Sequence, residues 1–247
     1  MRFKLFSIAN ILTLINAFFG CCALVMLFSA NYEYAFYCTL FSLVADFFDG
    51  FAARKFNSNS ELGKQLDSLA DAISFGVVPG VAVFMLLQGN SPLMPEELFT
   101  SYGLLFDSVK FLAFLIPLFS ILRLAKFNLD ERQSDHFIGL ATPANTIFWM
   151  GYLALHNAHQ YTFTGHIFLV VFLILMSSFL LIAEIPMFSF KFKNYQWKGN
   201  EVRYLFLLVS FALFLYFKVF AACMVVLLYI VLSLVIHMTK RKAHRSE

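Results

Sequence analysis

Four aspartates, Asp46, Asp49, Asp67 and Asp71, occupy one short stretch of this otherwise apolar chain. Residues three or four apart lie on the same face of a helix, so Asp46 and Asp49 would share a face of one helix and Asp67 and Asp71 a face of the next. Four carboxylates brought together repel one another unless they are protonated or neutralised by cations. Oxygen ligands suit hard divalent ions, so we predict a site for two divalent cations, Mg²⁺ or Mn²⁺, that would also hold a phosphate group.

Small residues and one arginine are interleaved with these acids. Gly50, Ala53 and Gly63 would let a ligand approach the backbone, and the Arg54 guanidinium is suited to pairing with a phosphate oxygen. A lone acidic pair near the end of a membrane helix is commonly a group that reaches the surface. Four acids at helical spacing on two adjacent segments, with small residues between them, favour a binding site instead.

The composition shows what must position these residues. Hydrophobic residues make up 60% of the 247, charged residues 13%, and the mean hydropathy is +0.76, whereas soluble domains contain about 25% charged residues. Apolar runs recur along the whole chain and leave no room for a separate soluble domain. We therefore predict an all-α polytopic membrane protein with a single membrane domain over residues 1–247.

About eight transmembrane helices are expected, at residues 7–29, 33–53, 67–88, 108–127, 142–157, 164–184, 202–217 and 219–238. The last two are joined almost without a loop. An even number of spans puts both termini on one side, and this arrangement leaves all but Lys110 and Lys218 of the 18 basic residues on the side of the aspartates. The positive-inside rule makes that side cytoplasmic. The net charge of +3 is assigned to loops facing anionic headgroups and not to nucleic acid.

The stretch from Asp46 to Asp71 matches, without departure, the pattern D-x2-D-G-x2-A-R-x8-G-x3-D-x3-D. The chain thereby resembles the CDP-alcohol phosphatidyltransferase family. The resemblance implies six core helices, here followed by two C-terminal ones, a possible homodimer, and transfer of a phosphatidyl group from a CDP-activated lipid to an alcohol with release of CMP. It also implies residue roles: two metals held by Asp46, Asp49, Asp67 and Asp71, a catalytic base at Asp71, and nucleotide and pyrophosphate contacts from Asp46, Gly50, Ala53, Arg54, Gly63 and Asp67.

Further stretches resemble the serine-accepting branch of that family: NILTLINAFFG (10–20), SLADAISFGVVPG (68–80), LRLAKFN (122–128) and FIGLATPAN (137–145). The branch often has Pro where this chain has Ala141, and usually has Ala where it has Asn145. The resemblance implies CDP-diacylglycerol and L-serine as substrates, CMP and phosphatidylserine as products, and the cytoplasmic membrane of a prokaryote as the location. We expect the acceptor to be bound by Arg123, Asn128, Thr142 and Lys191.

Alternatives remain open at this stage. Thr142 and Pro143 also suit the N-cap and first position of a helix. Asn10, Thr13 and Asn16 lie on one helix face and would either bond neighbouring helices or contact the nucleotide. The acceptor could instead be glycerol 3-phosphate or an inositol phosphate. Because acids within membrane helices also mark ion pathways, a cation transporter is the alternative from another class.

Overall fold

The computed structural model describes residues 5–56, 60–88, 108–130, 137–159, 167–187, 196–197 and 200–243. Almost all of them are helical. The elements in chain order are α1 (Ile8–Phe28), α2 (Tyr32–Lys55), α3 (Glu61–Asp71), the π-helix η1 (Ala72–Val77), α4 (Val78–Gln88), the short η3 (Lys110–Phe114), α6 (Leu115–Leu129), β1 (Phe137–Ile138), α7 (Thr142–His159), α8 (Ile167–Ile182), β2 (Pro186–Met187), α9 (Glu201–Phe217), the short η5 (Lys218–Phe220) and α10 (Ala221–Ala243).

Each predicted span coincides with a helical stretch of this structure. Within the described residues, five stretches are long and apolar enough to cross a membrane, at Ile8–Phe28, Tyr32–Lys55, Glu61–Gln88, Lys110–Leu129 and Glu201–Thr239. The prediction of an all-α polytopic membrane protein is confirmed. The third stretch begins at Glu61 and not at residue 67, because the Ser60 hydroxyl accepts a hydrogen bond from the Gly63 amide and caps the helix there.

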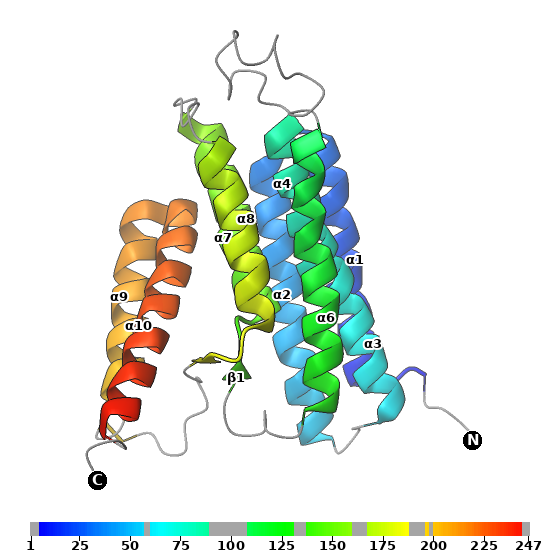
Figure 1. Cartoon of the computed structure of the whole chain (residues 1–247). Coiled ribbons are helices and arrows are strands. Elements are labelled where there is room, and N and C mark those ends of the chain that lie inside the picture. The colour runs from blue at the N-terminus through cyan, green and yellow to red at the C-terminus, as the bar shows by residue number, and fades with distance from the viewer. Residues whose placement is uncertain are drawn as a thin grey trace, which may run out of the picture.

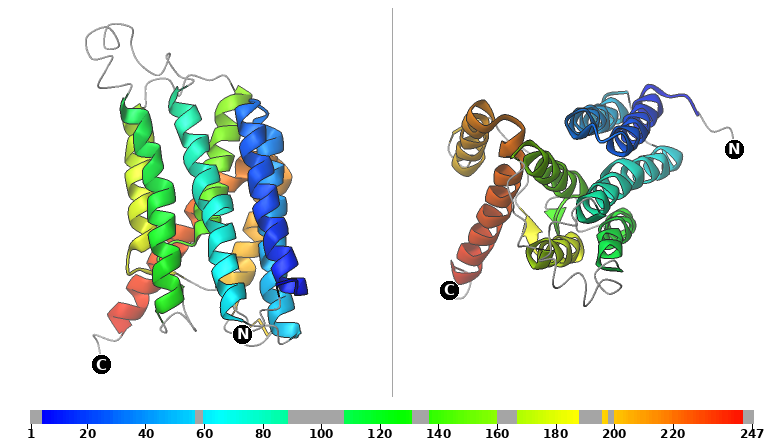
Figure 2. Two further views of the ribbon diagram at one scale, coloured as in Figure 1. Left: turned by 90° about the vertical axis from the view of Figure 1, so that its right-hand side faces the viewer. Right: turned by 90° about the horizontal axis from the view of Figure 1, so that it is seen from above.

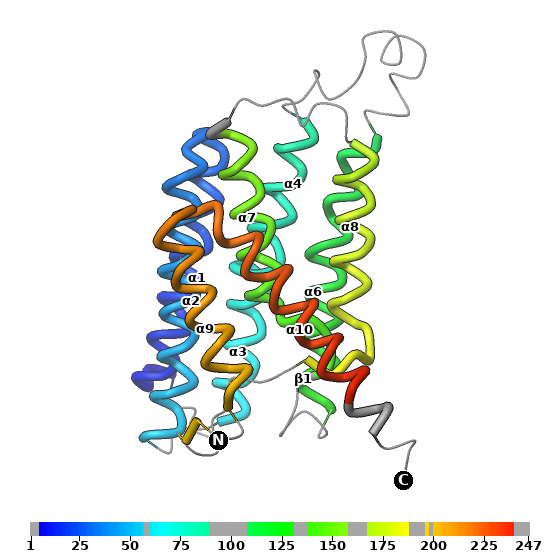
Figure 3. Tube along the Cα trace, turned by 90° about the vertical axis from the view of Figure 1, so that its left-hand side faces the viewer, coloured from blue at the N-terminus to red at the C-terminus, as the bar shows by residue number. Residues whose placement is uncertain are grey.

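The helices stand roughly side by side, and α1 begins at the same end of the bundle as α10 finishes (Figure 1). Seen from above, α1 and α2 lie beside α3 and α4, with α6, α7 and α8 next to them and the α9–α10 pair on the far side (Figure 2). The long α10 crosses the bundle at a slant (Figure 3). The segment from Asp46 to Asp71 therefore lies across the bundle from the C-terminal pair.

The predicted break between the last two helices is confirmed. Helix α9 ends at Phe217, and Lys218 adopts the positive φ of 52° that reverses the chain. Helix α10 then packs against α7 at very short range, because a Cβ added at Gly151 would lie only 2.7 Å from the Ala222 Cβ. The glycine thus allows the C-terminal pair to close against the bundle.

The third helical stretch changes geometry just after Asp71. Residues Ala72–Val77 form a π-helix, a feature often found at functional sites. Pro79 has no N–H to donate, and the carbonyl of Phe75, four residues earlier, accepts a hydrogen bond from the Thr146 hydroxyl of α7 at 3.0 Å. The irregular segment is therefore stabilised by a neighbouring helix.

Close packing also fixes α1 against this segment. A Cβ at Gly20 would lie 2.3 Å from the Ser74 Oγ and 3.0 Å from its Cα. Ser74 in turn donates to the Asn16 carbonyl at 3.1 Å. The buried core continues through α4, α6 and α7 and includes Phe75, Ile116 and Trp149. This rigid contact sets the rotation of α1 relative to Asp71.

Candidate active site

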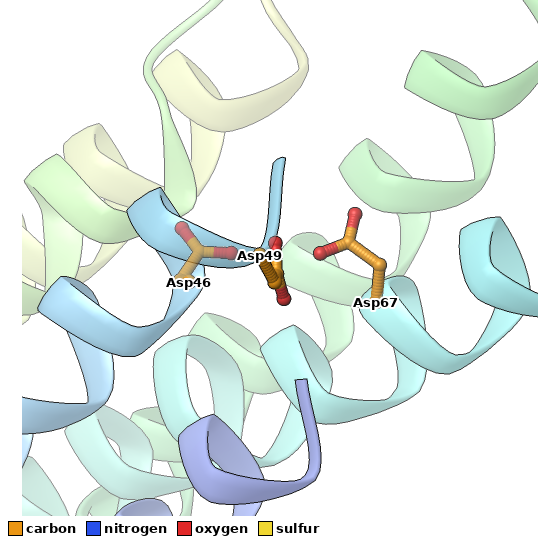
Figure 4. Close-up of side chains that lie close together, drawn as sticks. All are labelled: Asp46, Asp49 and Asp67. Carbon is orange, nitrogen blue, oxygen red and sulfur yellow. The ribbon is translucent and has the colours of Figure 1, made fainter. Parts of the chain in front are cut away.

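Three of the four aspartates converge where α2 and α3 meet. Asp46 and Asp49 project from α2 toward Asp67 on α3 (Figure 4). One carboxylate oxygen from each lies within 4.8 Å of the others. The two helices thus bring together residues from both halves of the motif, as their helical spacing predicts.

Asp71 lies next to this trio but faces a different partner. It is 8% exposed and accepts a hydrogen bond from the Asn16 side chain at 3.1 Å. Asp71 is therefore held in a fixed orientation beside the trio and is not one of the three convergent oxygens.

Helix α1 orients the carboxylates with a row of polar side chains. The Thr13 hydroxyl lies 2.7 Å from Asp49 Oδ2, so it donates a short hydrogen bond to that carboxylate. The Asn16 side chain donates to Asp71 in the same way. Asn16 is itself fixed by Ser42, whose hydroxyl donates to the Asn16 backbone carbonyl at 3.1 Å. The interpretation that this face bonds neighbouring helices is correct for Thr13 and Asn16. Ser42 and Ser74 were missed, because a lone serine in a membrane helix carries no distinctive signal.

A cavity of about 520 Å³ opens beside Asp49 and Asp67. Its lining includes three small residues predicted to contact a nucleotide, and it is formed by Ala9, Asn10, Thr13, Asp49, Gly50, Ala53, Ser60, Glu61, Gly63, Lys64 and Asp67. Binding sites for small molecules are commonly of this size. Ser60, Glu61 and Lys64 were not predicted, since they belong to the connecting turn and the start of α3.

Arg54 and Asp46 do not line this cavity. Arg54 is exposed, and its Nη1 would lie 3.4 Å from a Cβ placed at Gly50. It is close enough to Asp49 to interact with its charge. The Arg54 guanidinium thus lies beside Gly50, which lines the cavity.

The residues predicted to bind the acceptor have different environments in the structure. Arg123 on α6 is 7% exposed, donates from Nη1 to the Thr142 hydroxyl at 3.4 Å, and stacks at 5.1 Å from the centroid of the Phe127 ring. Its charge interacts with those of Asp71 and Asp46. Arg123 is thus a buried cation.

Asn128 joins two helices in the structure. Its side-chain amide donates to Ser68 Oγ at 2.7 Å, and its backbone carbonyl accepts from Lys64 Nζ at 2.6 Å. These bonds tie the end of α6 to α3, the helix of Asp67. Lys191 lies outside the described residues.

The assignment of Thr142 as a helix N-cap was wrong. Helix α7 begins at Thr142 itself, because the Ala141 carbonyl already accepts the first helical bond, from the Asn145 amide at 3.1 Å. The Thr142 hydroxyl is consequently available to Arg123.

The donor set fits a divalent cation. The three convergent groups are all carboxylates, the ligands that Mg²⁺ and Mn²⁺ prefer. Within the part of the chain that the structure describes, no lysine or arginine forms an ion pair with any of the four aspartates. A metal would neutralise charge that no direct ion pair compensates.

Several curated proteins similar to this chain share one name. A Bacillus subtilis protein named CDP-diacylglycerol–serine O-phosphatidyltransferase is 33% identical over 125 residues, which cover 49% of this chain and 63% of that protein. Proteins of the same name from Helicobacter pylori strain 26695 and Methanocaldococcus jannaschii are each 29% identical, over 64% and 63% of this chain and 61% and 65% of their own lengths. The chain thus spans somewhat less than two thirds of these relatives.

A sequence model described as CDP-alcohol phosphatidyltransferase matches residues 6–187, which include α1 to β2 and all four aspartates. The match covers most of the chain and leaves α9 and α10 outside it. This chain belongs to the CDP-alcohol phosphatidyltransferase family.

Proposed function

We propose that this protein is a CDP-diacylglycerol–serine O-phosphatidyltransferase, which transfers the phosphatidyl group of CDP-diacylglycerol to L-serine and releases CMP. The observation that carries the proposal is the convergence of Asp46, Asp49 and Asp67 beside a cavity of nucleotide size, at the end of membrane helices. The names of the similar curated proteins support the same reaction.

Asp46, Asp49 and Asp67 would hold the metal, with Asp71 beside them. Bound Mg²⁺ or Mn²⁺ would polarise the pyrophosphate and neutralise the charge of the CMP leaving group. The presence of two ions, and the choice between Mg²⁺ and Mn²⁺, follow from the family resemblance and belong to this proposal.

The cavity would take the cytidine nucleotide. Gly50, Ala53 and Gly63 place no large side chain in its lining, so the nucleotide can approach the α2 and α3 backbones. Thr13, while orienting Asp49, presents its side chain to the same space. Arg54 would contact a phosphate oxygen at the edge.

Asp71 would act as the base. The serine hydroxyl oxygen forms a bond to the lipid-bearing phosphorus, the bond between that phosphorus and the CMP oxygen breaks, and the hydroxyl proton passes to the Asp71 carboxylate. The hydrogen bond from Asn16 keeps the Asp71 carboxylate in one orientation. A general base needs such a fixed orientation to accept a proton from a bound substrate.

Arg123 would bind the serine carboxylate. It is a buried cation whose charge interacts with that of Asp71, so an acceptor held by it would lie near the base. Thr142 holds one end of the guanidinium. Asn128 would contribute indirectly, by fixing α6 to α3, and Lys191 remains a prediction from the family resemblance.

The proposed orientation in the membrane is based on the distribution of basic residues. Lys55, Lys64, Lys126 and Arg203 belong to the helix ends at the carboxylate side of the bundle, whereas Lys110 and Lys218 belong to the other side. By the positive-inside rule the site and both termini are cytoplasmic. We further propose a single domain over residues 1–247, located in the inner membrane of a prokaryote and assembled as a homodimer, as the resemblance implies.

The test supplies purified protein with CDP-diacylglycerol, Mn²⁺ or Mg²⁺, and separately L-serine, glycerol 3-phosphate, inositol or inositol phosphate. CMP release and the lipid product are measured. Phosphatidylserine formed only with serine supports the proposal. A product formed with another acceptor and none with serine would refute the serine assignment, and no CMP release with any acceptor would refute the transferase.

A further inference from the structure

Buried polar atoms without hydrogen-bond partners are concentrated on two neighbouring helices. Within the described residues six such atoms occur, and four of them are Ser120 Oγ and Arg123 Nε on α6 and the Oδ1 and Nδ2 atoms of Asn145 on α7. Asn145 is completely buried, at 0% exposure, yet neither end of its amide is bonded. Burial of an unpaired amide is costly, so a group of this kind indicates a missing partner.

Asn145 lies next to the proposed acceptor site. Thr142, one turn earlier on α7, accepts the hydrogen bond from Arg123 Nη1. Thr146, the following residue, binds the Phe75 carbonyl in the π-helix that follows Asp71. The first turn of α7 therefore contacts both the buried cation and the segment that carries the proposed base.

The C-terminal pair closes this region from the other side. Tyr229 of α10 is 8% exposed and packs in one buried cluster with Leu140, just before α7, and with Phe206 of α9, whose ring it meets edge-on at 6.2 Å. It is near enough to Arg123 for an electrostatic interaction. A ligand at Arg123 and Asn145 would thus be enclosed by α6, α7 and α10.

We propose that Asn145 is an acceptor-recognition residue, whose amide N–H donates to the carboxylate of a small amino acid and whose carbonyl accepts from its ammonium group. The inference rests on the proposed function and extends it. A zwitterion suits both ends of the amide: its carboxylate would pair with Arg123 and accept from Asn145 Nδ2, and its ammonium would donate to Asn145 Oδ1.

Two substitutions remove the amide of Asn145. Asn145→Ala deletes most of the side chain along with its hydrogen-bonding groups. Asn145→Leu removes the same hydrogen-bonding groups while keeping the branch at Cγ.

The experiment measures KM for L-serine, KM for CDP-diacylglycerol and kcat, with the full chain in mixed micelles containing Mn²⁺. Both variants are expected to raise KM for serine about tenfold, since one or two hydrogen bonds to charged groups are lost, with little change in the other two constants. N-acetylserine, which lacks the ammonium, should be discriminated against less by Asn145→Ala than by the parent protein. Ser210→Ala, which removes another unpartnered buried group but on α9, is the matched control and should leave KM for serine unchanged.

The outcomes separate the two proposals. If the parent protein makes phosphatidylserine and both Asn145 variants keep its KM for serine, the recognition role is refuted and the transferase stands. If KM for CDP-diacylglycerol rises equally, Asn145 acts through the general structure of the site and the recognition role is also refuted. If the parent makes no phosphatidylserine, both proposals fail.

Discussion

Replacement of Thr13 by valine tests whether α1 prepares the metal site. The substitution keeps the shape of the side chain and removes the hydroxyl that lies 2.7 Å from Asp49 Oδ2. Thr13 is 4% exposed, so its hydroxyl is enclosed by neighbouring helices. Asp49 would then be free to rotate away from Asp46 and Asp67.

The magnitude follows from the type of hydrogen bond. A bond to a charged group contributes about 1.5–3 kcal/mol, and loss of a group that orients a metal ligand typically weakens metal binding about 10- to 100-fold. We therefore expect Thr13→Val to bind Mn²⁺ at least about tenfold more weakly. The helix itself should be little affected, because Thr13 lies in the interior of α1 and valine preserves its packing.

Mn²⁺ binding is measured directly by electron paramagnetic resonance of the free ion, with the purified protein in detergent. Thr39→Val is the matched control: Thr39 is equally buried, in α2, but its hydroxyl donates to the Ala35 carbonyl of its own helix at 2.9 Å and does not contact the aspartates. Equal Mn²⁺ affinity in the parent, Thr13→Val and Thr39→Val would refute the reasoning.

Three further predictions concern the base, one turn and one surface pair. Asp71→Asn should retain most Mn²⁺ binding but abolish turnover, because Asp71 lies outside the three convergent oxygens; loss of Mn²⁺ binding as complete as in Asp67→Asn would make Asp71 a ligand instead. Gly139→Ala should destabilise the protein by about 2 kcal/mol, since Gly139 has a φ of +79° and its added Cβ would lie 2.7 Å from the Leu181 carbonyl oxygen; an unchanged thermal unfolding midpoint would contradict this. Lys126→Ala should cost less than about 0.5 kcal/mol in the same unfolding assay, because its ion pair with Glu184, at 3.2 Å, is solvent-exposed; a clearly larger loss would show a structural role.

The helical spacing of Asp46, Asp49 and Asp67 was sufficient to predict that these three residues meet. Asp46 and Asp49 share a face of α2, and the short connection makes α3 its neighbour, so Asp67 had to lie opposite. Apolar length likewise predicted the helical stretches among the described residues, and the near absence of a loop after Phe217 predicted the tight turn at Lys218. These features depend on local periodicity and chain connectivity, which a single sequence contains.

The distinct position of Asp71 could not be predicted in this way. It depends on how α1 is rotated against the π-helix, and that rotation is set by the close contact of Gly20 with Ser74. The role of Asn128 depends similarly on the crossing of α6 and α3, which places its amide at Ser68. The contribution of Tyr229 requires the C-terminal pair to fold back along α7, a long-range contact with no periodic signal.

The most direct test of the account is the stoichiometry of a single reaction. Purified protein is incubated with CDP-diacylglycerol, isotopically labelled L-serine and Mn²⁺, and labelled lipid and CMP are quantified together. The account predicts one phosphatidylserine formed per CMP released, no product without Mn²⁺ or with Asp67→Asn, and normal product with Thr39→Val. CMP release without labelled lipid, or undiminished product from Asp67→Asn, would contradict it.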